Sequence, residues 1–167
     1  MTTSQPPSTA NTTTKPQPII LTPSSISSHR QDTFPSASHG HNLTWLTLLS
    51  SPSTPSTSLS AGIATLRPNG YLALHRHRQA EIYYVLNGSA VVVIDNEKYR
   101  VGRGTVVFMP GDAEHGVFNY RDVKGDNNEG EGEDGNGEGK GEEDFIWLYI
   151  FPEGSFGDVV YRFSEKS

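Results

Sequence analysis

Short apolar runs separated by turns dominate this chain and limit the folds that it can adopt. The runs are rich in valine, isoleucine, leucine and aromatic residues, and glycine, proline or asparagine lies between them. No stretch has a convincing helical period, and many short strands with such turns are typical of a β-sandwich or β-barrel. We therefore predict an all-β domain with strands at residues 43–49, 59–66, 71–77, 81–86, 90–94, 98–101, 105–109, 115–120, 145–151 and 159–163. A turn is predicted at residues 67–70, where Arg-Pro-Asn-Gly ends the second strand.

Composition divides the chain into one domain and two polar segments. Residues 1–40 are dominated by serine, threonine, proline, glutamine and asparagine, and they contain too few apolar groups to offset the entropy lost on ordering. We predict that they form a disordered tail. Residues 124–144 are rich in glycine and acids, and we predict a disordered insertion at a loop tip. The domain is then expected over residues 41–167, with its barrel at 59–163.

Charge and cysteine content exclude several classes of function. The net charge of −6 comes from the acidic insertion, so the remainder is nearly neutral and gives no argument for nucleic-acid binding. No apolar run is long enough to span a membrane. The absence of cysteine excludes thiolate catalysis, disulfides and cysteine–zinc sites. A reducing compartment fits this composition, and we expect a cytoplasmic protein that binds neither nucleic acid nor membrane.

Residues 74–84 carry the strongest chemical signal in the chain. His75 and His77 are separated by one residue, so they share a face if both lie on one strand. Glu81 and Tyr83 likewise share a face of the next strand. The flanking residues are apolar, which favours burial of that face, and a buried carboxylate is costly without a cation beside it. Two imidazoles and a carboxylate on one interior face form most of a metal site.

A third histidine completes the predicted ligand set. His115 follows a predicted strand and a Pro-Gly turn, as a residue on the inner wall or mouth of a barrel does. Three imidazoles and one carboxylate suit a divalent first-row metal, with positions left for water or substrate. The order of affinities alone does not choose among Fe(II), Mn, Ni, Co and Zn.

The spacing of these residues resembles the two motifs of the cupin superfamily. The first motif is matched by Gly70, His75, His77, Glu81 and Gly88. The second is matched by Gly104, Pro110, Gly111, His115 and Asn119. Gly70 lies one residue closer to the first histidine than usual, and the glycine after the proline comes one position early, but neither departure involves a ligand. The resemblance implies a single cupin-type jelly-roll barrel and assigns the metal to His75, His77, Glu81 and His115.

A narrower resemblance concerns the reaction. Residues 74–83, 111–115, 150–152 and 156–161 resemble the small, single-domain cupin lyases that cleave dimethylsulfoniopropionate. In that family the metal binds the substrate carboxylate, a tyrosine removes the Cα proton, and β-elimination yields dimethyl sulfide and acrylate. By position, the base is Tyr83, and Tyr161 is a second polar group in the pocket.

Physical chemistry is consistent with this assignment. Free tyrosine has a pKa near 10 and is a poor base at neutral pH, but a nearby divalent cation favours tyrosinate. Alternating aromatic residues at 145–151 share one face, and Trp147 and Tyr149 are candidates to hold a cationic sulfonium group by cation–π attraction. Ordinary packing in a barrel core produces the same alternation.

Other functions share the same ligands, because fold and metal do not determine the reaction. One alternative is another metal-dependent cupin enzyme, such as an Fe(II) dioxygenase, an isomerase or a decarboxylase of a small acid. A second is a cupin that binds a small molecule without turnover, although such a protein does not need four metal ligands. In each case we expect a small carboxylate as the partner, and pairing through strands at residues 43–66 as a possible route to a homodimer.

Overall fold

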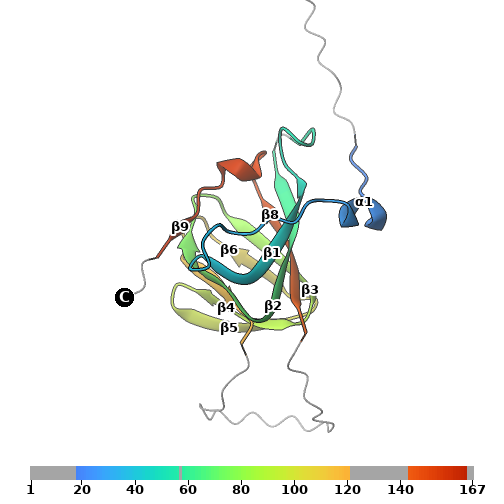
Figure 1. The fold of residues 1–167 in the computed structure, drawn as a ribbon. Helices are drawn as coiled ribbons and strands as arrows, with labels where there is room; N and C mark the ends of the chain where they lie inside the picture. The colour runs from blue at the N-terminus through green and yellow to red at the C-terminus, as the bar shows by residue number, and fades with distance from the viewer. Residues whose placement is uncertain (1–17, 57, 121–142, 165–167) are drawn as a thin grey trace, which may run out of the picture.

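The computed structural model describes residues 18–56, 58–120 and 143–164 of this 167-residue chain. Strands dominate this part and curl into a half-barrel (Figure 1), so the prediction of an all-β barrel fold is confirmed. The strands are β1 (Gly40–Leu49), β2 (Ser60–Arg76), β3 (Glu81–Asn87), β4 (Ser89–Ile94), β5 (Glu97–Gly102), β6 (Val106–Met109), β7 (His115–Phe118), β8 (Phe145–Phe151) and β9 (Arg162–Phe163). The helical turns are α1 (Pro23–Ser27) and η1 (Phe156–Asp158).

Strand β2 connects the two parts of the curled sheet. The strand order is β5-β4-β7-β2-β8-β3-β6, and β1 and β9 also pair with β2. Residues Ser60 to Leu66 of β2 pair with β8, whereas Tyr71 to His75 pair with β7. One continuous strand therefore supplies side chains to the interior from both parts of the sheet.

The predicted turn at residues 67–70 is wrong, because the chain does not reverse there. These residues form a bulge inside β2, with Asn69 at a φ of 60°. Asn119 satisfies the backbone of the bulge: its side-chain amide donates to the carbonyl of Leu66 at 3.0 Å, and its backbone exchanges hydrogen bonds with Asn69 and Gly70. The Pro-Asn-Gly sequence thus bends a strand at the point where it changes partner, as bulges commonly do.

The predicted disorder of residues 1–40 is wrong for residues 18–40. Backbone hydrogen bonds of 2.9 and 3.0 Å pair Asp32 with Trp45 on β1, and Phe34 packs against the core. Figure 1 shows this segment running from α1 across the barrel before β1 begins. Phe34, the bridge at Asp32 and the hydrogen bond from the Ala73 N–H to the carbonyl of His39 order a stretch whose average composition is polar. The part before residue 18 lies outside the described residues.

Two other predictions concern chain segments near the C-terminus. The last strand was expected at residues 159–163, but β9 contains only Arg162 and Phe163, and η1 precedes it. The acidic insertion at 124–144 lies outside the described residues except for its last two positions, so its disorder remains a prediction.

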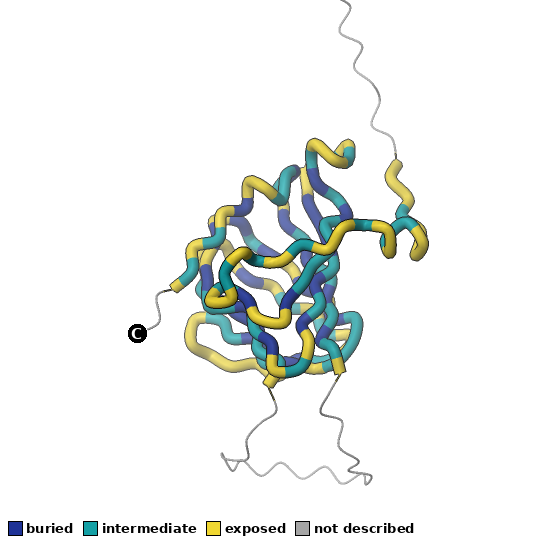
Figure 2. Tube along the Cα trace, viewed as in Figure 1, coloured by how far each residue is buried: buried dark blue, intermediate teal, exposed yellow. Residues whose placement is uncertain are grey.

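Burial alternates along the strands that line the interior (Figure 2). On β3, Glu81, Tyr83 and Val85 are buried, while Ile82 and Tyr84 are exposed. The alternation confirms the face predicted from strand parity. In the described part of the chain, neither helical turn has the length or apolar character required to traverse a lipid bilayer. The predicted homodimer and cytoplasmic location remain predictions.

Leu66 tests the importance of packing at the bend of β2. Its side chain is fully buried, so Leu66→Ala should lower the free energy of unfolding by about 2–5 kcal/mol through lost burial and a residual cavity. Leu59→Ala is the matched control, because Leu59 is 39% exposed and the change should cost less than about 1 kcal/mol. Urea unfolding of both variants measures the difference. Equal unfolding midpoints would contradict this account of the core.

Candidate metal centre

The structure brings the three predicted histidines together inside the half-barrel. His75 lies near the end of β2, His77 just beyond that strand, and His115 at the start of β7. All three side chains are buried, and one nitrogen from each lies within 4.8 Å of the others. Arg76, between the first two, is exposed, as alternation along an extended chain requires.

Backbone carbonyls fix the orientation of each imidazole ring. The Nδ1 atoms of His75 and His77 lie 2.8 Å from the carbonyl oxygens of Ala73 and Gln79, respectively. The Nδ1 atom of His115 lies 3.0 Å from the carbonyl oxygen of Ala113. A carbonyl oxygen only accepts, so each Nδ1 carries the proton and donates. In the neutral ring, every Nε2 therefore presents a lone pair, which is the state that binds a metal.

Glu81 lies between two of these lone pairs. Its Oε2 atom is 3.2 Å from Nε2 of both His77 and His115, and its side chain is 2% exposed. An unprotonated Nε2 and a carboxylate oxygen both accept hydrogen bonds, so their close approach requires a proton or a metal cation between them. His75 Nε2 is buried and has no hydrogen-bond partner among the described residues. A divalent cation would satisfy all four side chains.

Burial and charge affect the histidines differently. Burial, followed by the positive charge of His115, keeps the pKa of His75 well below its usual range. Burial also acts to lower the pKa of His77, but the hydrogen bond to Glu81 and the charge of that carboxylate outweigh it, so the pKa is raised. His75 is therefore neutral at physiological pH, whereas the raised pKa of His77 favours a proton on this imidazole in the metal-free protein. A metal replaces that proton when it binds.

The three histidines are thus positioned for a metal ion. Closed structural sites hold their metal with four protein ligands, whereas catalytic sites keep a position for water or substrate. Imidazole nitrogens suit several first-row metals, and the histidines by themselves do not distinguish among them.

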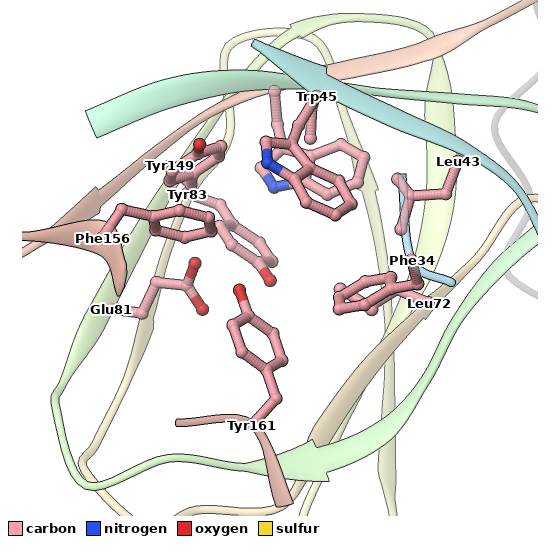
Figure 3. Close-up of a pocket in the computed structure, with 11 residues that line it drawn as sticks. Phe34, Leu43, Trp45, Leu72, Glu81, Tyr83, Tyr149, Phe156 and Tyr161 are labelled. Carbon is pink, nitrogen blue, oxygen red and sulfur yellow. The ribbon is translucent and has the colours of Figure 1, made fainter. Parts of the chain in front are cut away.

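Two tyrosine hydroxyls lie beside this cluster. Figure 3 shows the hydroxyls of Tyr83 and Tyr161 pointing toward each other near the Glu81 carboxylate. Burial, followed by the negative charge of Glu81, raises the pKa of both tyrosines well above the usual value of 10. Both hydroxyls are therefore neutral in the metal-free protein. The ring of Tyr161 also stacks on His75, with centroids 4.7 Å apart.

Trp147 and Tyr149 both line the pocket that ends at Glu81. The Tyr149 hydroxyl points away from the carboxylate (Figure 3) and lies 3.4 Å from the Thr47 hydroxyl. Tyr149 therefore presents its ring, and not its polar group, to the pocket. The two residues also belong to the hydrophobic core, so core packing accounts for the aromatic alternation, and a role in holding a sulfonium group stays a prediction.

Sequence reasoning did not identify the rest of the pocket wall. The remaining lining residues are Phe34, Leu43, Trp45, Ala64, Leu72 and Phe156. Phe34 lies in the segment that composition assigned to a disordered tail, and no local pattern indicates its position. Alternation along residues 43–49 places Leu43 and Trp45 on one face, and this is the signal that could have identified them.

Comparisons with known proteins agree with this structure. Residues 62–124 match the model of the family described as Cupin domain. Dimethylsulfoniopropionate lyase DddW of Ruegeria pomeroyi is 30% identical over 123 residues, which cover 74% of this chain and 67% of that protein.

Solved structures show the same fold. The polyketide cyclase RemF of Streptomyces resistomycificus has a TM-score of 0.61 at 19% identity, with 85% of this chain and 84% of that one covered. A chain from the structures of the dimethylsulfoniopropionate lyases RdDddP and RnDddQII has a TM-score of 0.53 at 20% identity. This match covers 74% of the present chain and 53% of the other chain. The curled sheet, the buried histidines and the sequence matches together show that this chain belongs to the cupin family.

Proposed function

We propose that this protein is a metal-dependent lyase that cleaves a carbon–sulfur bond by β-elimination. The substrate is dimethylsulfoniopropionate or a similar small carboxylate with a leaving group on its β carbon. One observation carries the proposal: two tyrosine hydroxyls and a buried carboxylate meet beside the three histidines at the polar end of an aromatic pocket. The similarity to a protein named as a dimethylsulfoniopropionate lyase supports the same reaction.

Four side chains would hold the metal: His75, His77, Glu81 and His115. A divalent ion held there would supply Lewis acidity toward the substrate carboxylate and toward the negative charge that develops as the Cα proton leaves. The backbone carbonyls behind the imidazoles keep the ligands oriented for this role.

Tyr83 is the proposed base. Its Oη atom takes the Cα proton, the electrons of the C–H bond form the Cα=Cβ double bond, and the Cβ–S bond breaks with its electron pair going to sulfur. The products are acrylate and neutral dimethyl sulfide, and Tyr83 then releases the proton to solvent. Tyr161, whose hydroxyl faces that of Tyr83, donates a hydrogen bond to the phenolate and keeps it oriented.

The buried position of Tyr83 makes this role dependent on the metal. Burial and the Glu81 charge raise the pKa of Tyr83 in the metal-free protein, which opposes loss of its proton. A divalent cation beside Glu81 reverses the sign of the local charge and favours the phenolate. Only the metal-loaded protein should therefore catalyse the reaction.

Metal content tests the ligand assignment. The purified protein should contain about one metal ion per chain. His75→Ala or Glu81→Gln should weaken metal affinity more than about 100-fold, because loss of a direct ligand costs more than loss of a residue that only orients a ligand. His41→Ala is the control, since His41 is an exposed histidine on β1. Elemental analysis and calorimetry measure both quantities. Equal losses in the His41 and His75 variants would rule out the assignment.

Headspace gas chromatography tests the reaction. The metal-loaded protein mixed with dimethylsulfoniopropionate should release dimethyl sulfide and acrylate in equal amounts without consuming oxygen, and a chelator should abolish release. Oxygen uptake with a small acid would instead indicate a dioxygenase. Retention of the acid without turnover with any of the five candidate metals would indicate a binding protein, and either result would refute the lyase.

Tyr83→Phe separates proton removal from metal binding. The variant loses only the hydroxyl, so turnover should fall about 10²–10⁴-fold, while metal content stays unchanged. Tyr84→Phe is a matched control, because the adjacent Tyr84 is exposed on the opposite face of β3. Dimethyl sulfide release and elemental analysis are measured on all three proteins. Retained activity in the Tyr83 variant would exclude it as the base.

A further inference from the structure

The four side chains of the candidate metal centre are closed off from solvent. His75 and His115 are fully buried, and His77 and Glu81 are 1% and 2% exposed. The cavity in front of Glu81 has a volume of about 20 Å³, which is room for about one water molecule. A metal ion or a small carboxylate therefore reaches the histidines only if part of the surrounding wall moves.

The chain that follows η1 covers two of the three imidazoles. The ring centroid of Tyr161 lies 4.7 Å from that of His75 and 5.5 Å from that of His77. The ring centroid of Phe163 lies 5.6 Å from that of His75. Figure 1 shows this part of the chain passing from η1 to β9 along one side of the barrel. We call residues 159–164 the strap.

The strap has an inner and an outer face. Val159 is buried and Tyr161 packs against the core, whereas Val160 and Arg162 are exposed. The two exposed residues line an open cleft of about 420 Å³, which Arg78 also lines. The strap therefore lies between this outer cleft and the buried imidazoles.

Few backbone hydrogen bonds attach the strap to the barrel. It pairs with β2 at two positions, and the N–H of Ser164 donates to the carbonyl of Leu74 at 3.0 Å. Phe151 also contacts His77, but it lies on β8, which pairs with β2 on one side and β3 on the other. Local opening is easiest where few backbone hydrogen bonds must break, so the strap is the part of this wall that separates at the lowest cost.

Two acids on the loop between β6 and β7 hold the strap in place. Arg162 lies directly opposite Arg76 in the pairing of β9 with β2, and like charges in that arrangement repel each other. The carboxylate of Asp112 pairs with Arg162, and its backbone carbonyl accepts a hydrogen bond from Arg76 at 3.0 Å. Glu114 Oε1 lies 3.4 Å from Nη2 of Arg76 and accepts a hydrogen bond from the Ser164 hydroxyl. The pairing of β9 with β2 therefore depends on these two acids.

We propose that the strap is the gate to the buried histidines and that Asp112 and Glu114 are its latch. Opening breaks the two pairs with β2, lifts Tyr161 off His75 and joins the outer cleft to the metal centre. The inference goes beyond the proposed reaction, because it concerns how a metal or a ligand enters, whatever chemistry follows. Arg162 is then a positioning residue, since its pairing with Asp112 keeps Tyr161 against the imidazoles.

A reversible covalent lock tests the gate. Cysteines in place of Arg76 and Arg162 would have Cα atoms about 4.5–5.5 Å apart, as in any directly opposed antiparallel pair, and a disulfide spans that distance. The natural chain has no cysteine to compete with them. Oxidised protein should release Zn²⁺ to an excess of coloured chelator at least about tenfold more slowly than reduced protein, within the range of disulfide stabilisation. Equal rates in the two states would overturn the proposal.

A second engineered disulfide is the matched control. Val93 and Lys98 lie opposite each other on β4 and β5, whereas the strap pairs with β2. Oxidation of cysteines at these two positions should leave the rate of Zn²⁺ release unchanged. A slowing as large as that of the lock on the strap would contradict the gate, because it would show that any stiffening of the barrel retains the metal.

Removal of one acid tests the latch. Asp112→Asn leaves the two arginines uncompensated, and asparagine tolerates the φ of 63° at this position. Zn²⁺ release should become about three- to fivefold faster, as the loss of an exposed ion pair allows. The double variant Asp112→Asn/Arg162→Gln also removes the repulsion, so it should release Zn²⁺ more slowly than the single variant. Glu97→Gln, at an exposed acid on β5, is the control and should match the wild type. An unchanged rate in Asp112→Asn would exclude the latch.

Hydrogen exchange of the metal-free protein measures opening of the strap without any ligand. The amides of residues 162–164 should exchange at least about threefold faster in Asp112→Asn than in the wild type, while those of β3 keep their rates. Faster exchange without release of dimethyl sulfide by the metal-loaded wild type would leave the strap standing and refute the lyase. Release of dimethyl sulfide with unchanged exchange would leave the lyase standing and refute the strap.

Discussion

A buried carboxylate surrounded by imidazole lone pairs is the constraint on which this structure depends. Glu81 is almost inaccessible to water, and two Nε2 atoms lie 3.2 Å from the same oxygen. An anion so deeply buried needs compensation by a cation, and three carbonyl-anchored rings can all contribute lone pairs to the same ion. A cation bound among these acceptors would therefore stabilise an arrangement that packing alone leaves uncompensated, and the two tyrosine hydroxyls lie beside it.

The shape of β2 allows the ligands to converge. His75 follows the bulge at residues 67–70, beyond which the strand leaves β8 and pairs with β7. His115 begins β7 and is directly paired with His75. The bulge held by Asn119 thus turns the histidine-bearing end of β2 toward the strand that supplies the third imidazole. A strand without this bulge would continue to pair with β8, and His75 would not lie opposite His115 on β7.

Local periodicity predicted much of the site, and long-range contacts account for what it missed. Alternation identified His75, His77, Glu81 and Tyr83 as inward-facing, because parity on a strand depends only on neighbouring residues. The Arg-Pro-Asn-Gly sequence suits both a turn and a bulge, and only the partner strands and Asn119 decide between them. Phe34 was missed because its order comes from contacts with Trp45 and the barrel, which the average composition of the first 40 residues does not reveal.

The clustered histidines and the aromatic wall of the pocket come from different segments of the chain, which has an evolutionary consequence. Phe34 and Phe156 lie in segments joined to the barrel by few backbone hydrogen bonds, whereas the three histidines and Glu81 occupy or adjoin paired strands. Substitutions in those segments can alter the shape of the pocket without changing the strand pairing of the barrel. Divergence at the two flanks of the domain would therefore reshape the pocket while leaving the side chains of the central strands in place.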